Sequence, residues 1–216
     1  MMFEGRDYVI SDARYLKLDI PVPHKDMLAE ALALRTSFIE YRDGDAQGWH
    51  SLPIVGKSST EPYAWNAYYT SAKEAAPNMQ FTEISKQCPV TVNWLKTVYP
   101  SNSYARVRFM LLEAGGSIGF HKDTDYSILG AVNVALNNPK QCAWHWKDGS
   151  QLEFNPGDAY AMNISYEHSI TNPSSEDRYH LIVHHYDSTP AWKQIMQTAM
   201  ETYETQGHFY YSTELF

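Results

Sequence analysis

The sequence predicts a mainly β fold of the β-sandwich or jelly-roll class, with α-helices flanking the sheet. After Ser103, short apolar stretches alternate with turn residues, a pattern typical of antiparallel strands and not of β-α-β units. Helical patterns occur on both sides of this region. The chain has 216 residues, of which 44% are hydrophobic and 14% aromatic, so it can bury a substantial core.

The length favours one compact domain over residues 1–216. Within it, residues 1–100 are expected to supply N-terminal strands and supporting helices, residues 101–187 the jelly-roll core with the functional site, and residues 188–216 a C-terminal helix and tail. The sequence does not set the oligomeric state.

The N-terminal half mixes strand and helix patterns. Residues 7–20 read as strands at a sheet edge, Lys25 to about Tyr41 as an amphipathic helix, Trp49–Val55 as a strand and Val90–Val98 as a second helix. Between them, residues 57–76 are aromatic but aperiodic. That segment is a candidate lid or substrate wall.

Eight strands are expected after residue 103, and a helix from Pro190 to about Thr205 follows them. The strands fall near residues 104–113, 117–121, 127–136, 142–147, 150–154, 158–164, 167–171 and 178–186.

Charge and cysteine content exclude several classes of partner. The formal net charge is -8, which works against a nucleic-acid partner, because a phosphate backbone requires a basic face. Cys88 and Cys142 form no CxxC motif and are too few for a disulfide scaffold. No signal-peptide pattern or membrane-length apolar run is present. We therefore expect a cytoplasmic protein with no membrane partner.

The first element that indicates chemistry is His121-Lys122-Asp123, in which two possible metal ligands lie two residues apart near a strand end. Such a pair is common, and alone it is better explained as a surface turn. Asp125 competes with Asp123 as the carboxylate, because it also lies an even number of residues from His121.

The second element is His168, followed ten residues later by Arg178, with turn residues between them. A hairpin here would place the two on adjacent strands. Neighbours sharing one face would lie roughly 5–8 Å apart, about the distance from an iron centre to the far carboxylate of a chelating 2-oxoglutarate.

Strand alternation places several polar side chains on one face. Arg178, His180 and His184 share a face of the last predicted strand, and Arg106 and Arg108 share a face of the first. This face could simply contact water. The convergence of arginines with a possible His/Asp/His set favours an interior site instead, since a buried guanidinium requires an anion.

A His/Asp/His set is the facial triad of non-haem iron enzymes, which leaves three octahedral positions for cosubstrate and oxygen. Zinc is a less natural occupant, because a zinc hydrolase needs a general base beside an open position.

Residues 104–186 resemble the aspartyl/asparaginyl β-hydroxylase-like branch of the iron(II)- and 2-oxoglutarate-dependent oxygenases. The resemblance is carried by Tyr104-Ala105-Arg106-Val107-Arg108, His121-Lys122-Asp123, Phe154-Asn155-Pro156-Gly157-Asp158 and the stretch from Glu167-His168 to Arg178-Tyr179-His180-Leu181.

This resemblance implies a double-stranded β-helix (jelly roll, cupin-like) with iron(II) bound by His121, Asp123 and His168. It implies that 2-oxoglutarate chelates the iron while its far carboxylate pairs with Arg178, and that Asn133 contacts the cosubstrate. The reaction it implies consumes molecular oxygen (O2), releases succinate and carbon dioxide, and hydroxylates the substrate.

Bacterial hydroxylases of free proline resemble the chain most in pattern, since they share the HxD form and an arginine thirteen residues before the first metal histidine. Here that arginine is Arg108, with Arg106 on the same face, and both are candidate substrate-binding residues. Met110 stands where vertebrate peptide hydroxylases of the branch have a serine. We therefore expect an amino acid or small amino-acid derivative as substrate.

Two alternative functions stay open. The substrate could be Asp, Asn or another residue in a peptide or protein, or the chain could be a cupin-like metal-binding module without oxygenase activity. His180, His184 and His145 are each more readily explained as hydrogen-bonded or packed structural histidines, although His180 or His184 could orient a ligand.

Overall fold

The computed structural model describes residues 13–41, 46–70, 72–123, 129–152, 154–186 and 189–205. Its strands are β1 (Tyr15–Leu18), β2 (Ile39–Glu40), β3 (Ala46–Gly56), β4 (Gln80–Phe81), β5 (Tyr104–His121), β6 (Leu129–Ala135), β7 (Ala143–Trp146), β8 (Gln151–Leu152), β9 (Ala159–Asn163), β10 (His168–Thr171) and β11 (Arg178–His185). The α-helices are α1 (His24–Ala33), α2 (Ala72–Ala75), α3 (Pro89–Thr97) and α4 (Pro190–Thr205), and short 3-10 turns lie at Arg35–Ser37, Trp65–Ala67 and Glu83–Gln87.

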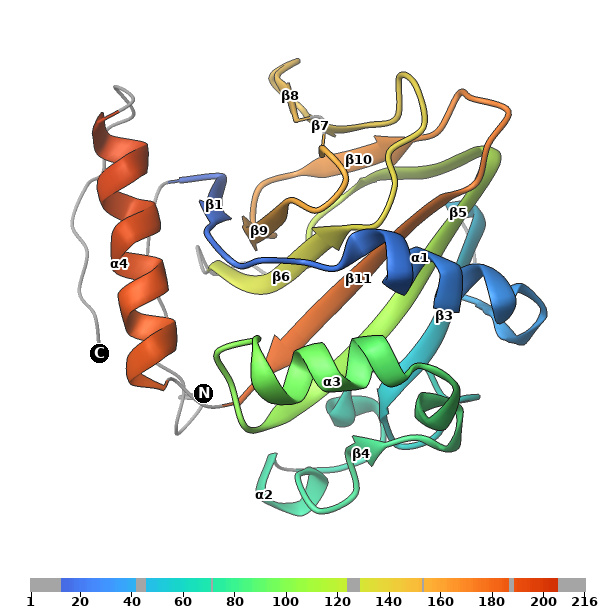
Figure 1. The fold of residues 1–216 in the computed structure, drawn as a ribbon. Coiled ribbons are helices and arrows are strands. Elements are labelled where there is room, and N and C mark those ends of the chain that lie inside the picture. Colours follow the sequence, from blue (N-terminus) through green and yellow to red (C-terminus); the bar gives the residue numbers. More distant parts are fainter. Residues whose placement is uncertain are drawn as a thin grey trace.

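The named strands form one curled sheet in which every pairing is antiparallel (Figure 1). Their order is β1-β9-β6-β11-β5-β10-β7-β8, and β3 pairs with β5 while carrying β2 and β4 on its other side. The expectation of a mainly β jelly roll with flanking helices is confirmed.

The long strand β5 shows why both faces of the sheet are buried. Val107, Phe109 and Leu111 point into an outer cluster that includes residues of α1, α3 and α4, whereas Met110 and Leu112 point into an inner cluster. Burying each such side chain contributes roughly 1.5–3 kcal/mol relative to exposure. The inner cluster packs around the interior of the curled sheet, where the candidate site lies.

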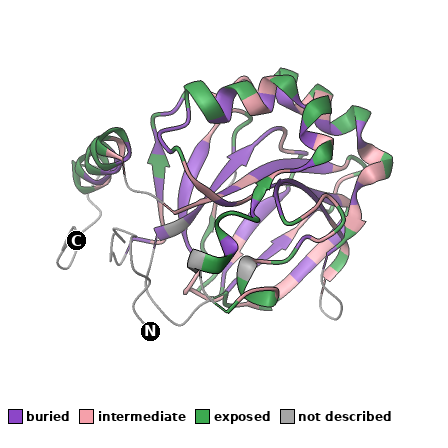
Figure 2. Cartoon of the chain, turned by 90° about the horizontal axis from the view of Figure 1, so that it is seen from below, coloured by how far each residue is buried: buried purple, intermediate pink, exposed green. Residues whose placement is uncertain are grey.

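Helices α1 and α3 cover the outer face of the sheet and are held to each other by polar contacts (Figure 1). The Glu30 carboxylate of α1 accepts hydrogen bonds from the backbone N–H groups of Val90 (2.6 Å) and Thr91 (3.1 Å). It thereby satisfies donors that the first turn of α3 leaves without helical partners. Figure 2 shows the result, with largely buried strands beneath helices whose outer sides are exposed.

The predicted helix from Lys25 to Tyr41 was too long. The α-helix ends at Ala33, and Leu34 leaves helical geometry at φ -102° and ψ 14°. Ile39 and Glu40 then pair with Ser51 and His50 as strand β2. Tertiary pairing with β3 therefore outweighs the helical periodicity of the apolar residues.

The two strands predicted at 104–113 and 117–121 form a single strand, β5. β3 pairs with both parts of this strand along one edge, whereas on the other edge the first part pairs with β11 and the last residues pair with β10. Gly115, at φ +75°, allows the backbone to change direction between these parts without steric cost. The remaining predicted strands after residue 125 are confirmed within about two residues, wherever they fall in the described ranges.

The helices predicted at Val90–Val98 and from Pro190 to Thr205 are confirmed, as is the strand at Trp49–Val55, which is longer than expected. The predicted edge strand in 7–20 corresponds to β1 at one end of the strand order, although residues 1–12 lie outside the described ranges. Among the described helices, none has both the length and the apolar character needed to span a bilayer.

Candidate active site

Three predicted metal ligands come together at one end of the sheet. His121 ends β5 and His168 begins β10, where the two are register partners on neighbouring strands. Asp123 follows β5, and its Oδ2 lies 3.9 Å from His121 Nε2 and 3.8 Å from His168 Nε2. The three ligand atoms all lie within 4.8 Å of one another, so one ion can contact all of them.

Backbone hydrogen bonds fix how the two imidazoles face this point. His121 Nδ1 lies 2.8 Å from the Gly119 carbonyl oxygen, and His168 Nδ1 lies 2.8 Å from that of Tyr166. Since a carbonyl only accepts, each Nδ1 must carry the proton, and each Nε2 keeps a free electron pair. Such outer hydrogen bonds are usual for metal-binding histidines.

The backbone N–H of Asp123 donates to the Ile164 carbonyl at 3.0 Å, which ties Asp123 to the connection between β9 and β10. Two imidazole nitrogens and one carboxylate form a donor set that suits iron(II) in a facial arrangement. The site thus fits the metal that the resemblance implies. The competing ligand Asp125 lies outside the described residues.

A cavity of about 480 Å³ opens beside these three side chains. Arg106 and Arg108 of β5 and His180 and His184 of β11 line it. Arg108 is only 3% exposed, so the reading in which this strand face contacts bulk water is wrong for that residue. Trp144 lines the cavity as well, and its ring stacks on that of His168 with centroids 4.3 Å apart.

Both cavity arginines contact the same backbone atom. Arg106 Nη1 and Arg108 Nη1 each donate to the Pro62 carbonyl oxygen at 3.3 Å, and the Arg108 guanidinium lies 4.6 Å from the centre of the Tyr41 ring. Burial, followed by the neighbouring charge of Arg108, lowers the pKa of Arg106. The pair is therefore an electropositive site suited to an anion.

The aperiodic segment 57–76 contributes a wall of this cavity. Tyr63, Ala64, Asn66 and Ala67 line it, and Pro62 contacts the arginines from the same side. The segment therefore forms part of the cavity wall, and its contact with substrate stays a prediction.

Arg178 lies behind the cavity and does not line it. It is 3% exposed, and its Nη1 lies 3.2 Å from Nδ1 of His180, which does line the cavity. The prediction that a hairpin places His168 and Arg178 on adjacent strands was wrong, because β10 and β11 do not pair with each other but pair one after the other with two parts of β5. The turn between them therefore does not fold β11 back onto β10, and both strands run antiparallel to β5.

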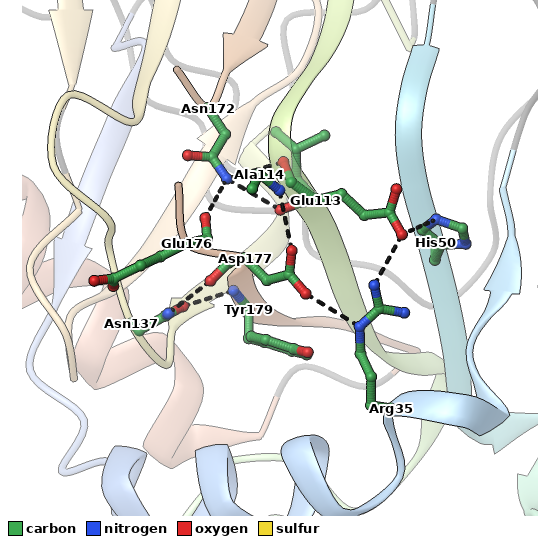
Figure 3. Close-up of polar contacts among 10 residues, drawn as sticks. Arg35, His50, Glu113, Ala114, Asn137, Asn172, Glu176, Asp177 and Tyr179 are labelled. Carbon is green, nitrogen blue, oxygen red and sulfur yellow. Dashed lines mark hydrogen bonds and ion pairs between the residues drawn. The ribbon is translucent and has the colours of Figure 1, made fainter. Parts of the chain in front are cut away.

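The turn that leads into Arg178 is fixed by a dense set of polar contacts (Figure 3). The Asn137 side chain donates to the Asp177 carbonyl (2.9 Å) and accepts from the Tyr179 N–H (2.6 Å), so it bridges the backbone on both sides of Arg178. Asp177 also accepts from the Ala114 N–H and pairs with Arg35. These contacts hold Arg178 at a set position.

The structure also describes the positions of the other predicted residues, Asn133, His184 and His145. Asn133 of β6 is 2% exposed and lines the cavity, opposite Ile182 in the register. His184 lies opposite Arg106 and also lines it. His145 does not line this cavity, and its Nε2 lies 3.1 Å from Thr171 Oγ1.

Two contributors to the site were missed from the sequence. The Pro62 carbonyl carries no residue-type signal, because any residue supplies that atom. Trp144 belongs to an alternating Trp-His-Trp strand, a pattern that usually indicates packing, and only its stacking on His168 distinguishes it.

A sequence model of the aspartyl/asparaginyl β-hydroxylase family matches residues 25–187. No curated protein sequence matches the chain. Solved structures with similarity include a prolyl-4-hydroxylase of Pseudomonas putida, at 14% identity and TM-score 0.45, covering 82% of this chain and 94% of that one.

A viral collagen prolyl hydroxylase from Paramecium bursaria Chlorella virus-1, solved with 2-oxoglutarate, gives 12% identity and TM-score 0.45 over 80% of this chain and 96% of that one. HygX from Streptomyces hygroscopicus, solved with nickel, 2-oxoglutarate and hygromycin B, gives 9% identity and TM-score 0.45 over 82% of this chain and 84% of that one.

Proposed function

We propose that this chain, which belongs to the aspartyl/asparaginyl β-hydroxylase family of iron(II)- and 2-oxoglutarate-dependent oxygenases, hydroxylates an amino acid or a small amino-acid derivative. The observation that carries the proposal is the shared cavity, which brings the His/Asp/His set and two arginines to one interior space. Family membership also sets aside the alternative of a metal-binding module without oxygenase activity.

In this proposal, His121, Asp123 and His168 hold iron(II), and the far carboxylate of 2-oxoglutarate is held at the Arg178 end of the cavity with Asn133 nearby. When bound, iron and 2-oxoglutarate together use dioxygen to oxidise a substrate C–H bond, releasing succinate and carbon dioxide. The chain's own residues orient the metal-binding imidazoles. The Gly119 and Tyr166 carbonyls keep both Nε2 atoms unprotonated and directed at the metal position.

Arg106 and Arg108 are the proposed substrate-binding residues. A substrate carboxylate can replace the neutral Pro62 carbonyl as their acceptor, and it forms stronger, charge-assisted hydrogen bonds. The cavity volume of about 480 Å³ supports a small substrate, since pockets for drug-sized ligands span about 300–1,000 Å³. Tyr63, Ala64, Asn66 and Ala67 border the same cavity, on the side where Pro62 contacts the two arginines.

An anaerobic titration of the apo-protein with iron(II) and 2-oxoglutarate tests the cofactor site through the visible metal-to-ligand charge-transfer band. Wild type should give the band, His168→Ala should lose it, and Arg178→Ala should require much more 2-oxoglutarate. His145→Ala is the matched control and should behave as wild type. Absence of the band in wild type at saturating ligand would refute the assignment.

The substrate class is tested separately, by succinate formation in air. Free amino acids and their small derivatives should stimulate turnover, whereas peptides that contain the same residues should not. Stimulation by peptides alone would favour the alternative, a hydroxylase of Asp, Asn or another residue within a peptide or protein.

A further inference from the structure

Oxidisable aromatic rings lie one after another beside the proposed metal site. The Trp144 ring stacks on His168 with centroids 4.3 Å apart, and its centroid lies 6.5 Å from that of Trp146. Trp146 stacks on Tyr15 at 5.7 Å, and Tyr15 meets Tyr160 edge-on at 5.6 Å. This aromatic series, Trp144, Trp146, Tyr15 and Tyr160, therefore leads away from a metal ligand through the inner cluster.

The far end of the aromatic series borders a second cavity, of about 390 Å³. Tyr15 and Tyr160 line it together with Lys17 of β1 and Tyr203 of α4. None of the described residues that line this second cavity also lines the cavity beside the metal ligands. A small molecule can therefore approach the last two rings of the series without entering the proposed active site.

The two indoles of the series have no hydrogen-bond acceptor among the described residues. Trp144 Nε1 and Trp146 Nε1 are both buried, and a buried donor without a partner costs free energy. Burial of an indole does not require this, since Trp94 in the outer cluster donates to the Pro21 carbonyl at 2.7 Å. Unsatisfied buried groups call for an explanation, and a redox role is one such explanation.

Tyr160 has the opposite arrangement, because its hydroxyl donates to Asp158 Oδ2 at 2.9 Å. A phenol that loses an electron becomes a strong acid, so a carboxylate within hydrogen-bond reach can take its proton as the electron leaves. An indole without an acceptor keeps its proton. Oxidised Trp144 or Trp146 would then remain a cation that draws an electron from the next ring, whereas oxidised Tyr160 would become a neutral radical.

The charge of Arg14 acts on the middle of the series. Its guanidinium lies 5.5 Å from the centre of the Trp146 ring, and it forms an ion pair with Asp148 that offsets part of its charge. The remaining positive potential opposes a cation on Trp146. A positive charge is therefore favoured further along the series, at the tyrosine that can release its proton.

We propose that the aromatic series is an electron-transfer path that protects the site when oxygen is activated without a substrate. One electron passes from Tyr160 along the series and reduces the oxidant formed at the iron, while the phenolic proton of Tyr160 moves to Asp158. A one-electron reductant of the ascorbate class then gives an electron to the tyrosyl radical from the second cavity, and Asp158 returns the proton. This inference rests on the proposed function, which supplies the oxidant.

The test uses protein loaded anaerobically with iron(II) and 2-oxoglutarate, without an amino-acid substrate. Oxygen is admitted, and the sample is frozen for electron paramagnetic resonance. Wild type should give a tyrosyl radical, identified by the narrowing of its signal in protein that carries ring-deuterated tyrosine. Tyr160→Phe should lose most of this signal, and so should Trp146→Phe, because the path is cut. Trp192→Phe replaces a buried indole of the outer cluster and, as the matched control, should keep it.

The charge-transfer band, recorded before oxygen is admitted, shows that each variant is folded and loaded. A band in wild type that is followed by no tyrosyl radical would overturn the inference alone, and so would a radical signal that Tyr160→Phe or Trp146→Phe leaves unchanged. Wild type that gives no band would refute the proposed function, and the inference would fall with it. The two failures are therefore distinguishable.

Peptide mass spectrometry after repeated exposure to oxygen gives a second readout. With ascorbate present and no amino-acid substrate, Trp146→Phe should accumulate more oxidation on Trp144 and His168 than wild type, because the charge can no longer leave along the series. Trp192→Phe should match wild type. Equal oxidation of Trp144 and His168 in Trp146→Phe and wild type would overturn the inference.

Discussion

His121 and His168 lie directly opposite each other on strands β5 and β10, with ring centroids 4.4 Å apart. The backbone hydrogen bonds between these two strands restrict the movement of one imidazole relative to the other. A site built on strands is held more precisely than one built on loops. The proposed metal centre therefore needs little rearrangement on binding iron.

Trp144 should report metal binding by fluorescence, because its ring stacks on His168 at 4.3 Å. Iron(II) added anaerobically should quench the protein emission, and Trp144→Phe should remove most of that quench. Trp192→Phe is the matched control, since Trp192 lies on α4 and belongs to the outer cluster. Equal quenching in the two variants would show that iron binds elsewhere.

Asn137→Ala should weaken 2-oxoglutarate binding without touching the cavity. The substitution leaves the Asp177 carbonyl and the Tyr179 N–H without their side-chain partner, at a cost of about 1–3 kcal/mol each when buried. Urea unfolding should report that loss. If Arg178 is displaced, the dissociation constant of 2-oxoglutarate should rise roughly tenfold for each 1.4 kcal/mol of binding free energy that is lost. Asn155→Ala, at an exposed turn, should change neither quantity.

Leu111→Ala should be among the more destabilising single substitutions. Leu111 is 0% exposed and points into the outer cluster, so its truncation should cost about 2–5 kcal/mol of unfolding free energy. Leu32→Ala on α1, where the side chain is 51% exposed, should stay within about 0.5 kcal/mol. Chemical denaturation of both variants checks this, and similar losses in the two would contradict the assigned burial.

The cysteines should be inert in the folded protein. Burial, with a smaller contribution from Glu30, raises the pKa of Cys88 to about 12, and burial raises that of Cys142. Iodoacetamide at pH 8 should leave native protein unmodified by intact mass, while both thiols should react in denaturant. Rapid labelling of native protein would contradict this.

The raised thiol pKa also predicts the sign of an alkaline effect. Between the unfolded value, about 8.5, and about 12, the folded state keeps the Cys88 proton while the unfolded state loses it. The unfolded state then binds fewer protons, so the Cys88 contribution to stability is full below about pH 8.5 and declines as the pH rises. Cys88→Ala should reduce the alkaline slope of the unfolding free energy between pH 9 and 11.

Local patterns were sufficient to predict most of the fold. Helix α4 matches its prediction from Pro190 to Thr205, and the alternation along β5 and β11 correctly separated the two strand faces. The errors arose where distant pairing decides the structure. Ile39 and Glu40 continue a helical pattern in sequence but pair with β3, which no local signal shows.

The candidate site was predicted by residue type more than by arrangement. His121, Asp123 and His168 do lie together, as their side-chain chemistry indicated. Their relation to Arg178 was not predictable, because the sequence does not show that β10 and β11 pair one after the other with a single long strand, β5, and not with each other. The sequence also does not show that His180 lines the cavity whereas Arg178 does not.

The continuity of β5 has a consequence for regioselectivity. Arg106, Arg108 and His121 belong to one strand, pinned along its length by β3, β11 and β10. In the proposed complex, the hydrogen-bonded backbone of β5 therefore fixes the distance between the bound substrate carboxylate and the carbon that is oxidised. Inserting or deleting one residue at the Gly115 bend would shift that spacing by up to about 3.3 Å, enough to direct oxidation to a different carbon of the same substrate.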